Sequence, residues 1–179
     1  MSNKKKLLIF MPTYEDEGVI QAFQASVDSF YDLDVPNGYE ADWVIGLDNP
    51  YGIKGRHKNT LHQYQKIQQR VLDEGYDALV TFEHDMIVPK DGLIKLIEID
   101  APVVYGLYML RHGSYSVNAF VRVEGNPNFR KSYSHYPEKF NNAEKNGVEQ
   151  VAGVGMGFTL FRREVLERFK FRKFDRNYP

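Results

Sequence analysis

The chain has 179 residues, 42% of them hydrophobic and 26% charged, which is the composition of one globular domain and not of a disordered segment. Its 23 basic and 24 acidic residues leave a net charge of −1, so no overall positive field is available to hold nucleic acid or an anionic membrane. Cysteine is absent, which excludes disulfides, thiolate metal sites and cysteine nucleophiles and leaves oxygen and imidazole groups as metal ligands.

The N-terminus resembles the start of a signal peptide, because three lysines precede the apolar run Leu7–Met11. That run is only about five residues long, whereas a signal peptide needs roughly 7 to 15. No segment approaches the roughly 18 apolar residues of a membrane-spanning helix. We therefore expect a soluble, cytoplasmic protein without a transmembrane segment.

The first part of the chain alternates apolar runs with helical patterns. Leu7–Met11, closed by Pro12, predicts a strand buried on both faces. A helix is predicted next from apolar residues at helical spacing, namely Ile20, Phe23, Val27 and Phe30. After a turn at 36–38, residues 43–47 predict a second buried strand that ends at Asp48.

The same alternation continues through the middle of the chain. A second helix is predicted by one apolar stripe, with Gly75 at its C-terminal cap; the stripe consists of Leu61, Tyr64, Ile67, Val71 and Leu72. Residues 78–82 predict a third strand, 91–97 a short helix and 103–110 a fourth strand. Strands and helices that alternate in this way predict a parallel sheet with right-handed crossovers.

The pattern changes in the last third of the chain. Alternating residues over 116–123 predict an edge or antiparallel strand, and 124–147 lacks periodicity and predicts a long loop. The glycines of 153–157 lead into an apolar run at 158–161 and a tail helix that carries Val165, Leu166 and Phe169.

Polar segments follow three of the predicted strands. They are Pro12-Thr13-Tyr14-Glu15, Asp48-Asn49 and Glu83-His84-Asp85. Ligands of open α/β sheets bind at the carboxyl ends of the strands, so these segments are the candidate binding site. Asp48 could accept a hydrogen bond from a nucleobase or a ribose hydroxyl. The alternative is that residues 48–52 form only a turn.

Glu83 and Asp85 form the candidate metal site. In an extended chain, residues two apart point to the same side. Two carboxylates without thiols predict a hard oxygen site for Mg²⁺ or Mn²⁺. A solvated strand end or a helix N-cap is the alternative, and His84 by itself is better explained as a structural hydrogen-bond partner than as a ligand.

Basic residues precede the second helix. Arg56, His57 and Lys58 offer cations for a phosphate beside the helix N-terminus, with a solvated basic loop as the alternative. The repeat Gly153-x-Gly155-x-Gly157 is not a dinucleotide fingerprint, because that motif follows the first strand of its fold. The remaining histidines, His62, His112 and His135, show no ligand spacing.

Taken in order, these motifs resemble the nucleotide-diphospho-sugar glycosyltransferases of the GT-A fold, especially family 2-like members and their short viral or phage-encoded versions. Residues 12–15 with Glu17 look like the Pro-Thr-Tyr-Asn-Glu opening, and Asp48 looks like the acid that reads the base. Residues 56–59 resemble the following Arg-Asn segment and 83–85 the Asp-x-Asp metal motif. Residues 153–165 resemble the later glycine, apolar and Arg-Arg-Glu-Val segment.

The resemblance implies a fold and an activity. The fold is a single-domain GT-A (Rossmann-like) three-layer α/β/α sandwich with a mostly parallel sheet, whose nucleotide-binding half is 1–110 and whose acceptor-side half is 111–179. The activity is transfer of a sugar from a UDP- or GDP-sugar to a hydroxyl of a carbohydrate or glycoprotein acceptor, with Mn²⁺ or Mg²⁺. A viral member would act in the host cytoplasm.

The resemblance also implies roles for particular residues. Glu83 and Asp85 would hold the metal, with Glu83 in place of the usual aspartate. The residues implied to bind the nucleotide sugar are Pro12, Thr13, Tyr14, Glu15, Asp48, Arg56, Asn59 and His84.

An inverting transferase also needs a general base near the acceptor hydroxyl. Ala152 stands where many relatives carry an acid, so we expect Glu149 or Asp175 to take this role, with Glu149 favoured and Glu144 a further candidate. Two other functions remain open. A nucleotidyltransferase would normally place a glycine-rich basic loop after the first strand, whereas residues 13–18 are acidic. A non-catalytic nucleotide-sugar-binding module would need no base.

Overall fold

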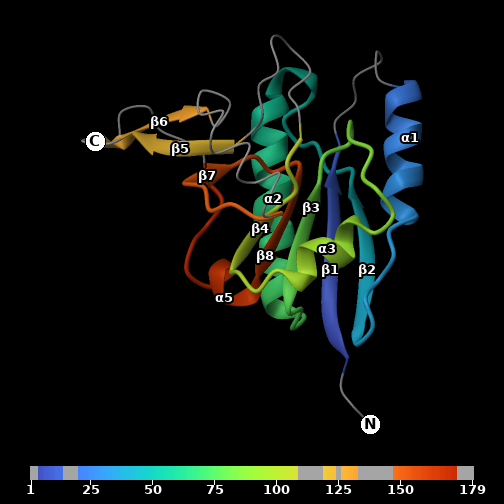
Figure 1. The fold of residues 1–179 in the computed structure, drawn as a ribbon. Coiled ribbons are helices and arrows are strands. Elements are labelled where there is room, and N and C mark those ends of the chain that lie inside the picture. Colours follow the sequence, from blue (N-terminus) through green and yellow to red (C-terminus); the bar gives the residue numbers. More distant parts are fainter. Residues whose placement is uncertain (1–3, 14–19, 109–118, 124–125, 133–146, 173–179) are drawn as a thin grey trace. The chain divides into compact units, whose positions relative to one another are not determined.

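A computed structural model describes residues 4–13, 20–108, 119–123, 126–132 and 147–172 (Figure 1). The chain forms two compact units. The larger consists of Met1–Gly106 and Met156–Arg176, and the smaller of Leu107–Gly155 and Asn177–Pro179. The description of the whole chain as one glycosyltransferase-like domain with halves at 1–110 and 111–179 stays a prediction.

A five-stranded sheet lies at the centre of the larger unit. Its strands, in spatial order, are β2 (Tyr39–Gly46), β1 (Lys5–Pro12), β3 (Ala78–Phe82), β8 (Phe158–Arg162) and β4 (Val103–Tyr105). β1 pairs in parallel with both β2 and β3, while β8 pairs antiparallel with β3 and β4. Four strands therefore run in one direction and β8 runs against them. The predicted mixed α/β fold with a mostly parallel sheet is confirmed at this level.

Helices pack against both faces of this sheet. The first face carries α1 (Ile20–Tyr31) and α3 (Gly92–Glu98), whose Phe30, Leu93 and Leu96 pack in one core with alternate residues of the strands. The second face carries α2 (Arg56–Asp73), which follows a short 3₁₀ turn at Ile53–Gly55, and α5 (Arg163–Leu166). Because successive strand residues point to opposite faces, the continuous apolar run in β1 supplies both cores.

Two consecutive arginines at the end of β8 cap one helix on each face. The guanidinium group of Arg162 donates to carbonyl oxygens at the end of α3, and that of Arg163 donates to carbonyl oxygens at and just beyond the end of α2. The acceptors are Ile97 (3.2 Å) and Ile99 (3.3 Å) for Arg162, and Leu72 (2.9 Å), Val71 (3.1 Å) and Tyr76 (3.2 Å) for Arg163. Ile97 in the last turn of α3, and Val71 and Leu72 in the last turn of α2, thereby gain donors for carbonyls at helix ends, where partners within the helix are lacking.

The smaller unit contains a three-stranded antiparallel sheet. Its order is β6 (Asn126–Ser132), β5 (Ala119–Val123) and β7 (Gly153–Val154). The antiparallel strand predicted over 116–123 is confirmed by β5. The loop predicted over 124–147 is wrong at 126–132, because backbone pairing with β5 forms a strand there without an apolar period. Residues 133–146 lie outside the described part of the chain.

Several predicted boundaries are also corrected. β2 ends at Gly46, and Leu47, which was predicted in the strand, is 75% exposed. β4 ends at Tyr105, whereas the prediction extended it to 110, beyond the described residues. The tail helix ends at Leu166, before Phe169, because the amide of Gln68 on α2 donates to the carbonyls of both residues and holds the chain outside a helix.

The prediction of Gly75 near the end of the second helix is confirmed. Glu74 is the C-cap of α2, and Gly75 follows it with a φ of 75°. This is a left-handed conformation that glycine adopts without strain. None of the helices in the described ranges has both the length and the apolarity needed to cross a membrane.

Candidate functional site

Three of the predicted binding segments meet at one end of the larger sheet. Thr13 follows β1, Asp48 lies just beyond the end of β2, and Glu83 follows β3. β1 lies between β2 and β3 and is parallel to both, so all three segments emerge at the same end. We call this region the carboxyl end of the sheet. It is the place where open α/β sheets bind ligands.

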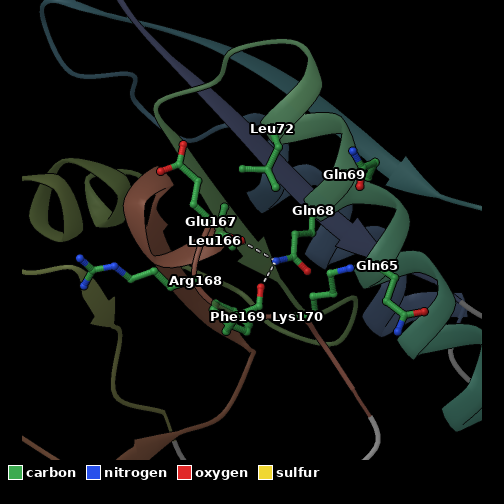
Figure 2. A pocket seen from close by; sticks show the side chains of 9 residues that line it. All are labelled: Gln65, Gln68, Gln69, Leu72, Leu166, Glu167, Arg168, Phe169 and Lys170. Atoms are coloured by element: carbon green, nitrogen blue, oxygen red, sulfur yellow. Dashed lines mark hydrogen bonds between the residues drawn. The ribbon is translucent and has the colours of Figure 1, made fainter.

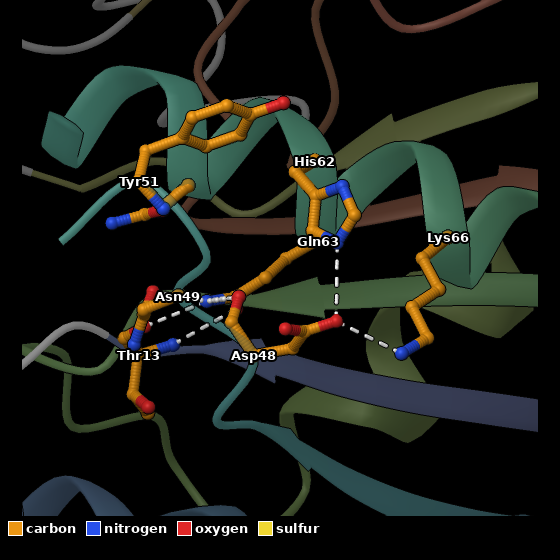
Figure 3. Close-up of polar contacts among 8 residues, drawn as sticks. Thr13, Asp48, Asn49, Tyr51, His62, Gln63 and Lys66 are labelled. Carbon is orange, nitrogen blue, oxygen red and sulfur yellow. Dashed lines mark hydrogen bonds and ion pairs between the residues drawn. The ribbon is translucent and has the colours of Figure 1, made fainter.

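The Asp48 carboxylate contacts two side chains of α2, Lys66 and His62 (Figure 3). Its Oδ2 accepts a hydrogen bond from Lys66 Nζ at 2.9 Å and lies 3.1 Å from His62 Nε2. These contacts lower the pKa of the Asp48 carboxyl below its ordinary value, and the hydrogen bond from Lys66 has a larger effect than the one with His62. The Asp48 side chain is still 46% exposed, and its Oδ1 has no partner among the described residues. One carboxylate oxygen can therefore accept a donor group from a ligand.

Gln63 connects the ends of β1 and β2 (Figure 3). Its Nε2 donates to Thr13 O at 2.8 Å, to Asn49 Oδ1 at 2.8 Å and to Asp48 O at 3.3 Å, and its Oε1 accepts from Thr13 N at 3.3 Å. Thr13 Oγ1 also donates to the carbonyl of Gly46. Gln63 is only 3% exposed, so these bonds form in a protected environment.

Asn59 has a structural role in this arrangement. It is 1% exposed; its Oδ1 accepts from Tyr51 N and its Nδ2 donates to Gly52 O, both at 2.9 Å. The side chain thereby fixes the turn that leads from β2 to α2. The predicted contact of Asn59 with a nucleotide sugar stays a prediction. In this structure the Asn59 amide is buried and bonded to the backbone of the turn.

The first turn of α2 is positively charged. Arg56, His57 and Lys58 are exposed, and the first turn itself contains no acidic residue. The helix dipole is also positive at this end, so the turn attracts anions. Tyr51, 52% exposed, lies beside this turn, with Lys58 Nζ 5.8 Å from the centre of its ring. The combination suits an anionic ligand that also carries a ring.

The acidic segment after β3 forms a turn. Met86 N donates to Glu83 O at 3.2 Å, and Glu83 N donates to Gly157 O at 2.7 Å. The backbone at Glu83–Asp85 is therefore not extended as expected, because β3 ends at Phe82, and the placement of both carboxylates at one metal site stays a prediction. Both carboxylates are half-buried. Within the described ranges, no group of three or more acidic or histidine side chains could hold a metal ion.

His84 is almost completely buried, at 7% exposure. Its ring centre lies 6.5 Å from that of Phe23 on α1, with the two planes tilted by 50°. This packing is consistent with the structural explanation of the histidine. Pro12, which begins the first predicted segment, is also buried.

The segment that follows the acidic turn is fastened to α1. Ser29 Oγ donates to Val88 O at 2.9 Å and accepts from Val88 N at 2.8 Å. Asp34 N donates to Lys90 O at 2.9 Å, and Lys90 Nζ lies 3.7 Å from the Asp34 carboxylate. The acidic turn is thus held at both of its ends. Its first residue, Glu83, is bonded to Gly157, and the segment that follows the turn is bonded to α1.

The structure does not test the remaining predicted site residues. Tyr14, Glu15 and Asp175, together with Glu17, lie outside the described residues. Glu149 lies in the smaller unit, shortly before β7, and is half-buried. The assignment of Glu149 or Asp175 as the general base stays a prediction.

A separate cavity of about 420 Å³ lies between the C-terminal half of α2 and the segment after β8 (Figure 2). None of the predicted nucleotide-sugar or metal ligands lines it. Its walls are formed by Gln65, Gln68, Gln69, Leu72, Leu166, Glu167, Arg168, Phe169 and Lys170. The side-chain amide of Gln68 is fully engaged with the backbone of the segment after β8. Its Nε2 donates to Leu166 O and Phe169 O, and its Oε1 accepts from Phe171 N.

The sequence prediction missed the α2 side chains that hold Asp48. His62 and Lys66 are four residues apart, and Lys58 comes four residues earlier, so a basic stripe at helical spacing was present as a signal. Gln63 gave no such signal, because a buried glutamine and an exposed one look alike in a sequence. In comparisons with known proteins, no protein-family model and no curated protein matches this chain.

Proposed function

We propose that this protein is a glycosyltransferase that moves a sugar from a UDP- or GDP-sugar to a hydroxyl of a carbohydrate or glycoprotein, with Mn²⁺ or Mg²⁺. One observation carries the proposal. The Thr13, Asp48 and Glu83–Asp85 segments, which the resemblance assigns to donor and metal, emerge together at the carboxyl end of one sheet. These segments lie about 35 residues apart in the sequence, and the parallel pairing of β1 with β2 and β3 brings them to one end of the sheet.

Asp48 would bind the base or ribose of the donor. Its Oδ2 is engaged by Lys66 and His62, which fix the carboxylate and keep it ionised. Its Oδ1 is available to accept an N–H or O–H group of the nucleoside. Arg56 and the positive first turn of α2 would lie beside the diphosphate, which carries the opposite charge.

The acidic turn fits a hard divalent cation. Glu83 and Asp85 supply carboxylate oxygens without thiols, and Mg²⁺ is commonly held by one or two carboxylates together with phosphate oxygens and water. Such a cation would neutralise the charge that develops on the departing diphosphate. Phosphate oxygens of the donor would then complete the coordination of the cation that these two carboxylates begin.

The acceptor hydroxyl must lose a proton during transfer. In an inverting reaction, Glu149 or Asp175 would accept that proton as a general base. Removal of such a base typically lowers the rate by roughly 10² to 10⁴ while donor binding persists. Transfer rate and donor affinity in Glu149→Gln and Asp175→Asn therefore test each assignment separately.

The experiment that tests the function is a panel of labelled UDP- and GDP-sugars incubated with the protein and Mn²⁺. We expect slow release of the labelled sugar from one donor, and loss of this release with chelator or in Asp85→Asn. Donor binding without any turnover would favour a nucleotide-sugar-binding module. Pyrophosphate release from a nucleoside triphosphate and a sugar phosphate would favour a nucleotidyltransferase. No binding of any nucleotide would refute all three.

A further inference from the structure

We propose that Gln63 is a positioning residue that sets where the Asp48 carboxylate lies, by fastening the chain after β2 and the chain after β1 to α2. The consequence for donor binding rests on the proposed function. The placement of Asp48 itself can be tested without any ligand.

Side chains from one stretch of α2 contact both the carboxylate and the backbone of Asp48. His62 and Lys66 contact its carboxylate oxygen Oδ2, whereas Gln63 contacts its backbone carbonyl at 3.3 Å. The same amide nitrogen bonds the side chain of the next residue, Asn49, at 2.8 Å. The neighbouring residue Leu47 is 75% exposed and gives this segment no buried contact of its own. Gln63 is therefore the buried anchor of the segment that carries Asp48.

The position of the Gln63 amide is itself fixed by packing. A Cβ atom added to Gly46 would lie 2.3 Å from Gln63 Oε1 and 2.9 Å from ring atoms of Phe10. The amide therefore fills the space next to Gly46, with no room for even one methyl group. On the other side it is bonded to both the N–H and the carbonyl of Thr13. An amide constrained in this way transmits its position to Asp48.

α2 also provides a matched control. Gln68 is a second buried glutamine on the same helix, 5% exposed, and its amide likewise bonds to several chain groups. Its partners, however, are Leu166, Phe169 and Phe171 in the segment after β8, not the segments after β1 and β2. Substitution of Gln68 should cost comparable stability without affecting Asp48.

The first measurement compares Gln63→Leu with Gln68→Leu by NMR titration of the Asp48 carboxyl group. In the wild type, Lys66 and His62 lower the pKa of Asp48. We expect this pKa to rise toward its ordinary value in Gln63→Leu and to stay unchanged in Gln68→Leu. An unchanged Asp48 pKa in Gln63→Leu would overturn the proposal, whatever the protein binds.

The second measurement is calorimetric titration of the same variants with UDP and GDP in the presence of Mn²⁺. Loss of a well-placed charged acceptor should weaken binding about tenfold in Gln63→Leu, and Gln68→Leu should match the wild type. If Gln63 acts through Asp48, Gln63→Leu should have no further effect in an Asp48→Asn background. Additive losses would overturn the proposal.

These measurements separate the two hypotheses. A wild type that binds no nucleotide refutes the proposed function, while the Asp48 titration still decides the role of Gln63. If Gln63→Leu does not fold, Asn49→Ala removes one Gln63 bond from a less buried position. It should shift the Asp48 pKa in the same direction, and no shift in that variant would again overturn the proposal.

Discussion

Gly46→Ala is predicted to destabilise the protein strongly through two buried neighbours. The new methyl group would stand 2.3 Å from Gln63 Oε1 and 2.9 Å from two ring carbons of Phe10. Those side chains are 3% and 2% exposed, so neither can move into solvent. Overpacking of this kind costs about 1 to 3 kcal/mol, and a lost hydrogen bond of Gln63 adds about 1 kcal/mol. We therefore expect a loss of about 2 to 4 kcal/mol in the free energy of unfolding.

The assay is urea unfolding followed by the fluorescence of the single tryptophan, Trp43, which lies on β2 and donates to Phe30 O at 3.0 Å. A matched control is Gly106→Ala, whose new methyl group would meet Phe158 at 3.0 Å and should cost only about 1 kcal/mol. For a chain of this length, the melting temperature of Gly46→Ala should fall by about 5 to 15 °C. Equal losses in the two variants would refute the argument that the Gln63 amide is tightly confined.

Further predictions concern the site and the helix caps. Asp48→Ala should weaken UDP or GDP binding about tenfold in calorimetry while metal dependence persists, whereas Asp42→Ala, another carboxylate change on the β2 side, should not. A nucleoside diphosphate should raise the melting temperature only with Mn²⁺, and equal shifts with and without chelator, or in Asp85→Asn, would contradict the metal role. Because the pKa of Asp48 is lowered on folding, its ion pair stabilises above about pH 4 and this stabilisation is lost as pH falls through the lowered value. Unfolding of Asp48→Asn measured from pH 6 to pH 2 should therefore show a shallower acid loss than the wild type. Arg163→Met should lower the free energy of unfolding by about 2 to 4 kcal/mol in urea, more than Arg162→Met, because it removes three backbone contacts instead of two.

The sequence was sufficient for the parallel part of the fold. Leu7–Met11 and Ala78–Phe82 are continuous apolar runs, and both form strands that are buried on both faces. The antiparallel insertion of β8 between β3 and β4 could not be predicted, because an apolar run does not encode its partner. β6 was missed for the related reason that Asn126–Ser132 lacks an apolar period and depends on pairing with β5.

The site was predictable to a similar degree. Thr13 and Asp48 could be chosen because polar residues directly after buried strands gather at the carboxyl end of a sheet. The extended backbone assumed for Glu83 and Asp85 was wrong, because the chain turns there. The partners of Asp48 depend on which face of α2 packs against the sheet. The apolar stripe of that helix was the only feature of the sequence that indicated this face.

The position of β8 has a consequence for how the chain is made. β4 pairs with β8 alone among the described strands, and β8 is separated from β4 by the whole segment 107–155. During synthesis from the N-terminus, β1, β2 and β3 can pair early, but β4 must wait until about 50 further residues have left the ribosome. Until then β3 exposes an unpaired backbone edge, which is a template for association with other chains. Nascent or truncated chains that end before Phe158 should therefore depend most on chaperones.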